Sequence, residues 1–489
     1  MSLEKMVMSG ILWTFFDNFV IKGLSFLTML ILARVLTPED FGLIGSISIF
    51  IAISTTLVDG GLTSSLIRST EVDNDDYTTI FYTNIITSVL LYIFLFCCAP
   101  MIATFFKQEI IKSIVRIYGL VFVISSFSSV QTTILIRDLN FKKLAILNIP
   151  SVLTGSGVAL YMGYHGYGVW SLVTMYLAVQ IISVIFLWCF STWKPTLRFS
   201  IAKFKKHFSY GYKLLLTGIL GNIFNNIYGV VIGRFFPIKV LGYYDRANTF
   251  SQYPATVLIL MIGKVSFPIL ARYQHDMTIF TLNFKRFITY SLYFTAPVMI
   301  TISFFSKIFF EGFLGGEWKV AAPYFEILCY AAVFLPLHAL NTNALKIYGR
   351  TDIVLKLEII MKILITITLL IGFQFGIIGI VYSALANSIL LMGLNMYFVG
   401  LILPFTFADQ LKTLSKILLL SSVLIIVFNF ARNIYPELEM SLIKLSLFSI
   451  INIIIYIAIS KILNFEEGNF VFNIFGKGLS LIKNKSYEI

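Results

Sequence analysis

The sequence has few charged residues, few cysteines and few histidines, and each shortage excludes a class of protein. Charged residues make up 12% of its 489 residues, whereas soluble proteins carry roughly a quarter. The four cysteines lie in apolar stretches without a C-x-x-C pair, so we expect neither disulfides nor a metal site. The four histidines are scattered, and no G-x-x-x-x-G-K-[ST] phosphate loop is present. We therefore expect no metal, no cofactor and no ATP site.

Long apolar runs are abundant instead. Hydrophobic residues make up 58% of the chain and form fourteen stretches of membrane-spanning length. A helix needs about 20 mostly apolar residues to cross a bilayer, and continuous runs favour helices over barrel strands. The predicted spans are 10–36, 41–66, 78–106, 115–137, 144–164, 168–190, 210–235, 247–271, 287–306, 321–347, 353–373, 376–400, 414–430 and 443–460. The sequence thus predicts an all-α polytopic membrane protein with no room for a soluble catalytic domain, hence a protein that is not an enzyme.

The formal charge of +13 follows from topology rather than from nucleic-acid binding. With the N-terminus in the cytoplasm, the cytoplasmic loops hold twice as many Lys and Arg residues as the outer loops, as the positive-inside rule requires. We expect a multi-pass protein of a bacterial inner membrane with both termini cytoplasmic. The longest basic break, 193–213, is typical of an amphipathic segment on the cytoplasmic leaflet.

The two halves of the chain resemble each other at an offset of 200 residues. Arg34, Gly42 and Phe50 recur as Arg234, Gly242 and Phe250 at the exit of equivalent helices. Six spans separate such pairs, which predicts two six-helix bundles in parallel repeat, an arrangement that suits alternating access. The predicted parts are an N-terminal lobe (1–193), a basic linker (194–209), a C-terminal lobe (210–402), two extra helices (403–460) and a cytoplasmic tail (461–489).

Several spans carry polar side chains where lipid excludes them. Lys22 and Lys264 lie near mid-span, and such cations are tolerated only beside a wet cavity or a partner. A cation-lined cavity suits an anionic, phosphate-bearing substrate. The predicted substrate-binding residues are Lys22, Lys264, Lys362, Asn18, Asn222, Asn225, Asn226, Arg34 and Arg234.

Each of these sets also has a purely structural interpretation. The asparagines of span 210–235 either line the cavity or bond to a neighbouring helix. Glu358 and Lys362 are spaced for an internal ion pair, and Arg34 and Arg234 could be interface anchors. Asp17, Asp59 and Glu358 are the candidates for coupling to H⁺ or Na⁺. If Asp17 or Asp59 were the essential group, the chain would instead be a cation-coupled multidrug antiporter.

The ordered motifs of the chain resemble those of Wzx-type polysaccharide-repeat flippases. The motifs are Ser9-Gly10-x-x-Trp13, Leu32-Ala33-Arg34-x-Leu36-x-Pro38-x-x-Phe41-Gly42, Asp59-Gly60-Gly61-Leu62, Ile136-Arg137-Asp138-Leu139-Asn140-Phe141, Gly166-Tyr167-Gly168-Val169-Trp170, Leu241-Gly242-Tyr243-Tyr244-Asp245-Arg246-Ala247 and Gly315-Gly316-Glu317-Trp318. This family lies in the multidrug/oligosaccharidyl-lipid/polysaccharide exporter (MOP) superfamily, and colanic-acid exporters look most similar.

The resemblance implies two lobes of six helices with two extra C-terminal helices. It also implies translocation of undecaprenyl-pyrophosphate-linked oligosaccharides for O-antigen, capsule or exopolysaccharide synthesis, driven by an ion gradient or the membrane potential. Expected partners are the lipid-linked oligosaccharide, membrane lipids, a polysaccharide polymerase and a chain-length regulator, with the flippase itself a monomer. Related flippases place arginines at the pyrophosphate, whereas the mid-span cations here are lysines.

Overall fold

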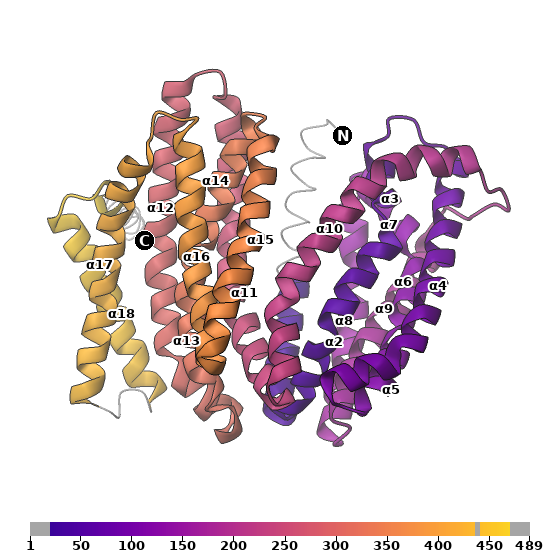
Figure 1. Cartoon of the computed structure of the whole chain (residues 1–489), viewed down its shortest axis with the longest axis horizontal. Coiled ribbons are helices and arrows are strands. Elements are labelled where there is room, and N and C mark those ends of the chain that lie inside the picture. Colours follow the sequence, from indigo (N-terminus) through magenta and orange to yellow (C-terminus); the bar gives the residue numbers. More distant parts are fainter. Residues whose placement is uncertain (1–19, 436–440, 470–489) are drawn as a thin grey trace, which may run out of the picture. The chain divides into compact units, whose positions relative to one another are not determined.

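The computed structural model describes residues 20–435 and 441–469, apart from the side chains of Met261 and Lys264. The described chain is helical throughout and contains no β-strand. Contacts divide it into two compact units, Met1–Asp245 and Arg246–Ile489 (Figure 1). The predicted all-α class is confirmed.

The first unit contains a helix over 20–35 and nine labelled helices. They are α2 (Pro38–Asp59), α3 (Leu62–Arg68), α4 (Asn74–Phe106), α5 (Ile110–Tyr118), α6 (Leu120–Ser126), α7 (Ser129–Arg137), α8 (Phe141–Tyr164), α9 (Val169–Phe190) and α10 (Ile201–Phe235). Thr37 and Asp73 begin α2 and α4 with capping boxes, which satisfy backbone N–H groups at the helix start. Helix α11 (Ile238–Arg272) begins in this unit and continues into the second.

The second unit continues with seven further helices and two short turns. They are α12 (Met277–Phe304), η1 (Ile308–Leu314), η2 (Gly316–Trp318), α13 (Ala321–Ala332), α14 (Leu335–Ile347), α15 (Thr351–Gln374), α16 (Gly376–Gly400), α17 (Phe407–Ile434) and α18 (Leu442–Ile462). Within this unit α17 and α18 pack against each other and against α12, at one flank (Figure 1). The stacked rings of Phe304 and Phe428, with centroids 3.8 Å apart, join α12 to α17.

Two predicted spans, 41–66 and 115–137, are not single continuous helices. The span 41–66 is broken because Gly60 and Gly61 both adopt positive φ (56° and 68°), which ends α2 and starts α3. The span 115–137 is divided among α5, α6 and α7, with a bend of 44° between 110–126 and 129–137. Hydropathy detects an apolar stretch but carries no information about a change of helix direction inside it.

With α13 and α14 counted together, eleven described helices are long and apolar enough to cross a membrane, or twelve when the bent pair counts as one span. The chain is therefore a membrane protein with many candidate spans. Two predicted spans are not among these: the first, of which the structure describes residues 20–35, and the eleventh, which corresponds to α15. The number fourteen and the six-plus-six repeat stay predictions.

Helix α10 packs against α2, α3 and α4 of the first unit. It begins at Ile201, so it contains the second half of the predicted linker 194–209 and continues without interruption to Phe235. The division between the two units falls later, inside α11. The predicted lobe boundaries themselves stay a prediction.

The starts of α2 and α11 meet backbone to backbone through Gly42 and Gly242. A Cβ placed on Gly42 would clash with the carbonyl oxygen of Ile238, and one placed on Gly242 would clash with that of Pro38. The two contacts are equivalent. Residues 38 and 42 correspond to residues 238 and 242 at the offset of 200, so each glycine lies against the carbonyl oxygen of the residue four positions before the other glycine. The two glycines that align at the offset of 200 residues thus lie against each other within the first unit.

We expect Gly42→Ala and Gly242→Ala each to lower the midpoint of thermal unfolding in detergent. The added methyl must push the helices apart, and overpacking of this kind costs about 1–3 kcal/mol. Gly221→Ala is the matched control, because no heavy atom lies within 4 Å of a Cβ at that α10 position. Unchanged midpoints for both test variants would contradict the close contact.

Candidate functional site

The polar stripe of α10 faces α2. Asn222 Nδ2 donates to the carbonyl oxygen of Ala52 at 3.0 Å and to Thr56 Oγ1 at 2.7 Å. One turn later, Asn226 Oδ1 accepts a hydrogen bond from Ser48 at 3.1 Å. These bonds are the interhelical packing that was one of the two interpretations, while a substrate contact of Asn222 or Asn226 stays a prediction. Asn225, on another face of α10, has an exposed side chain.

The end of α10 is fixed to the end of α4 by Arg234. Its guanidinium donates to the carbonyl oxygen of Phe105 and lies 5.0 Å from the centre of the Phe105 ring. Both interpretations of Arg234, as an interface anchor and as a cation at the mouth of the cavity, stay predictions. Arg34, its counterpart at the repeat offset, has an exposed side chain on the helix over 20–35.

The beginning of α10 is tied to α3 and α4 by a buried network that sequence reasoning missed. His207 is fully buried, with Nδ1 2.8 Å from Ser65 Oγ and Nε2 3.0 Å from Asp76 Oδ1. Asp76 is itself only 2% exposed. A buried carboxylate is tolerated when it is paired and hydrogen-bonded, which is the case here.

Lys203 closes this network one turn before His207. Its ammonium group donates to Asp76 Oδ2 at 3.1 Å and also pairs with Asp73. The hydrogen bond from Lys203 holds the pKa of the Asp73 carboxyl well below its ordinary value. One sequence signal was available: Asp73 and Asp76 have the three-residue spacing of a capping box, which places both carboxylates at a helix start.

Asp59, predicted as an ion-coupling residue, closes the turn between α2 and α3. It accepts hydrogen bonds from the backbone N–H of Gly61 at 3.2 Å and from the hydroxyl of Thr63. Both carboxylate oxygens therefore have local partners. Lys22, on the helix over 20–35, has a half-buried side chain.

In the second unit Glu358 and Lys362 form the ion pair that their spacing allows, with Nζ 3.2 Å from Oε2. The internal ion pair is thus confirmed, while a substrate contact of Lys362 stays a prediction. Lys264 lies on α11, but its side chain is outside the described part of the structure. Asp17 and Asn18 also fall outside the described residues.

The described side chains supply hydrogen-bond donors and point charges rather than metal ligands. Among residues 20–435 and 441–469 no group of three or more His, Cys, Asp or Glu could hold a metal ion. Some predicted site residues lie in the first unit and others in the second, and the residues of each unit are described by themselves. Within the first unit the structure brings Asn222 and Asn226 together at α2 and places Arg234 away from them, at the end of α4.

We expect Asn222→Ala to destabilise the protein and Asn225→Ala to leave its stability unchanged. The first variant loses both hydrogen bonds to α2, and interhelical bonds in membranes contribute about 1 kcal/mol. The midpoints of thermal unfolding in detergent measure the difference in stability between the two variants. The variants carry the same substitution at positions three residues apart. Equal midpoints would refute the packing role of Asn222.

The sequence of the chain is similar to those of known proteins of polysaccharide biosynthesis. The family model described as "Polysaccharide biosynthesis protein" matches residues 31–323. The lipopolysaccharide biosynthesis protein WzxC of Escherichia coli K12 is 23% identical over 80% of this chain and 80% of its own length. The teichuronic acid biosynthesis protein TuaB of Bacillus subtilis 168 is 23% identical over 72% and 73%.

The fold has a counterpart among solved structures. The lipid II flippase MurJ in an inward closed conformation superposes with a TM-score of 0.70, covering 93% of this chain and 99% of its own at 14% identity. At that identity the likeness concerns the fold alone. Because the family model covers more than half of the sequence, the chain belongs to the polysaccharide biosynthesis protein family.

Proposed function

We propose that the chain is a flippase that moves undecaprenyl-pyrophosphate-linked oligosaccharides from the cytoplasmic to the outer leaflet by alternating access. The observation that carries the proposal is a half-buried lysine, Lys22, on an apolar helix of a polysaccharide biosynthesis protein. A cation in that place is costly unless it serves an anionic ligand or has a partner.

The residues divide into two groups under this proposal. Lys22 and Lys264 bind the pyrophosphate, and Asn18 and the exposed Asn225 donate to sugar hydroxyls. Asn222, Asn226 and Arg234 hold α10 in place through their bonds within the first unit. Lys362 contributes less, because Glu358 offsets its charge.

The surroundings of the flippase follow from the same proposal. It lies in the bacterial inner membrane with both termini cytoplasmic, and H⁺ or Na⁺ drives its cycle. A polysaccharide polymerase and a chain-length regulator take up the product. Arg34 lies at the outer end of its helix, where a cation can meet the departing headgroup.

The antiporter alternative has less support. It requires an available carboxylate at Asp17 or Asp59, and both oxygens of Asp59 accept local hydrogen bonds. The relatives WzxC and TuaB are named for lipopolysaccharide and teichuronic acid biosynthesis. Those names favour a polysaccharide precursor over a drug.

We expect Lys22→Ala and Lys264→Ala each to lower surface polysaccharide about ten- to hundredfold in a strain that lacks the chromosomal copy. A charge-assisted hydrogen bond is worth roughly 1.5–3 kcal/mol, which gives a loss of that size. Arg in place of Lys should preserve part of the activity because the charge remains.

Lys356→Ala is the control, since that lysine is exposed on α15. Immunoblots must show equal amounts of each variant in the membrane. Wild-type polymer levels from both Lys22→Ala and Lys264→Ala would refute the assigned roles.

A further inference from the structure

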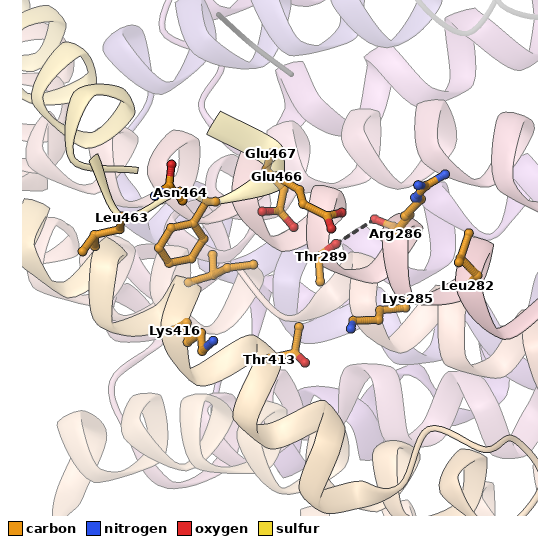
Figure 2. A pocket seen from close by; sticks show the side chains of 12 residues that line it. Leu282, Lys285, Arg286, Thr289, Thr413, Lys416, Leu463, Asn464, Glu466 and Glu467 are labelled. Carbon is orange, nitrogen blue, oxygen red and sulfur yellow. Dashed lines mark hydrogen bonds between the residues drawn. The ribbon is translucent and has the colours of Figure 1, made fainter. Parts of the chain in front are cut away.

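The second unit contains a charged pocket of about 290 Å³ that the proposed transport does not use. Its walls come from the first half of α12, the beginning of α17 and the segment 463–467 that follows α18 (Figure 2). All three elements reach the same end of the unit, because α12 and α17 begin there and α18 ends there.

Charges of opposite sign come from different walls of this pocket. The helices supply three cations, Lys285 and Arg286 from α12 and Lys416 from α17, while the segment after α18 supplies Glu466 and Glu467 (Figure 2). Among the described residues no ion pair joins these three cations to Glu466 or Glu467, although all five residues line the same pocket. Lys285 also lies near the carboxylate of Asp409 on α17. Thr413 also lines the pocket, and its hydroxyl donates to the carbonyl oxygen of Asp409 at 2.8 Å.

The pocket is held by a rigid frame. Tyr293 of α12 shares a hydrogen bond of 2.7 Å with Ser460 of α18, and the Tyr456 hydroxyl donates to the carbonyl oxygen of Tyr293 at 3.1 Å. The segment after α18 folds back closely, since a Cβ on Gly468 would clash with Ser460. Glu467 is consequently only 7% exposed although it lines the pocket. Burying a carboxylate is costly unless it is paired, so Glu467 is suited to a cationic group of a ligand in this pocket.

The location of the pocket and the charges that line it indicate which kind of ligand it would bind. Helix α18 is a candidate span with a mean hydropathy of 2.3, so the residues directly after it lie at the level of lipid headgroups. Lys and Arg are suited to phosphate oxygens, and carboxylates accept hydrogen bonds from a primary ammonium group. A headgroup that carries both a phosphodiester and a primary ammonium satisfies both walls at once.

We propose that this pocket binds the phosphoethanolamine headgroup of a membrane phospholipid. Lys285, Arg286 and Lys416 hold the phosphodiester, and Glu466 and Glu467 hold the ammonium group. The site is independent of the transport proposal, because it requires only that the second unit lie in a membrane. It predicts a lipid preference that a purely basic phosphate site would not show.

The test is lipid binding to the purified full-length protein, measured by native mass spectrometry with phosphatidylethanolamine, phosphatidylcholine and phosphatidylglycerol of identical acyl chains. We expect phosphatidylethanolamine to be retained most, since choline offers no N–H donor and glycerol no cation. Lys285→Ala combined with Lys416→Ala should weaken its binding about tenfold, as expected for losing charged contacts. Lys412→Ala, an exposed lysine on α17 outside the pocket, is the control.

A double variant, Glu466→Gln with Glu467→Gln, tests the ammonium contact by the direction in which lipid binding changes. It should weaken phosphatidylethanolamine binding while leaving or raising that of phosphatidylglycerol, because only the ammonium contact is lost. Soluble phosphoethanolamine should compete better than inorganic phosphate, which separates the headgroup from a general phosphate site. Equal or tighter binding of phosphatidylglycerol by the wild type, or a Gln variant that binds both lipids more tightly, would overturn the proposal. Unchanged thermal unfolding without added lipid shows that the variants are folded.

Discussion

Backbone polar groups inside a membrane must be satisfied within the protein, and burying a side-chain polar group is costly unless it too finds a hydrogen-bond partner. This constraint is most visible along α10. Polar side chains of α10 find partners at three places. His207 bonds to Asp76 and Ser65, and Asn222 and Asn226 bond to α2. Arg234 donates to the carbonyl oxygen of Phe105 at the end of α4. These bonds fasten one long helix to the first unit along its whole length. A polar residue that is occupied in this way is part of the frame.

The same constraint narrows the set of residues that can serve a substrate. Asp59 is occupied by the turn after α2, and Glu358 by Lys362. Among the described residues this leaves Lys22 and Asn225 as candidates for a substrate contact. Lys264 and Asn18, whose side chains the structure does not describe, stay candidates from the sequence. Cations on apolar helices suit a pyrophosphate headgroup, which is the chemical basis of the proposed flippase.

The sequence predicted the helices well because hydropathy is a local property. It missed the break at Gly60–Gly61, since apolar residues continue on both sides of the turn. Packing partners were harder: Asn222 bonds to Ala52, which is 170 residues away, and His207 to Asp76, which is 131 residues away. A single sequence records the residue types but not which helices meet, so packing and cavity roles looked alike. Gly42 and Gly242 align at the offset of 200 residues, but the sequence did not predict that the two lie against each other.

Transport of a reconstituted lipid tests the central claim most directly. Vesicles containing the purified protein would receive two fluorescent polyprenyl-linked oligosaccharides with the same sugar, one attached through pyrophosphate and one through a neutral ether. Accessibility of the label to a membrane-impermeant quencher then reports translocation. The account predicts that the pyrophosphate-linked lipid crosses and that the neutral analogue stays on its original side, as in protein-free vesicles. Equal crossing of both lipids, or no crossing of either, would contradict it.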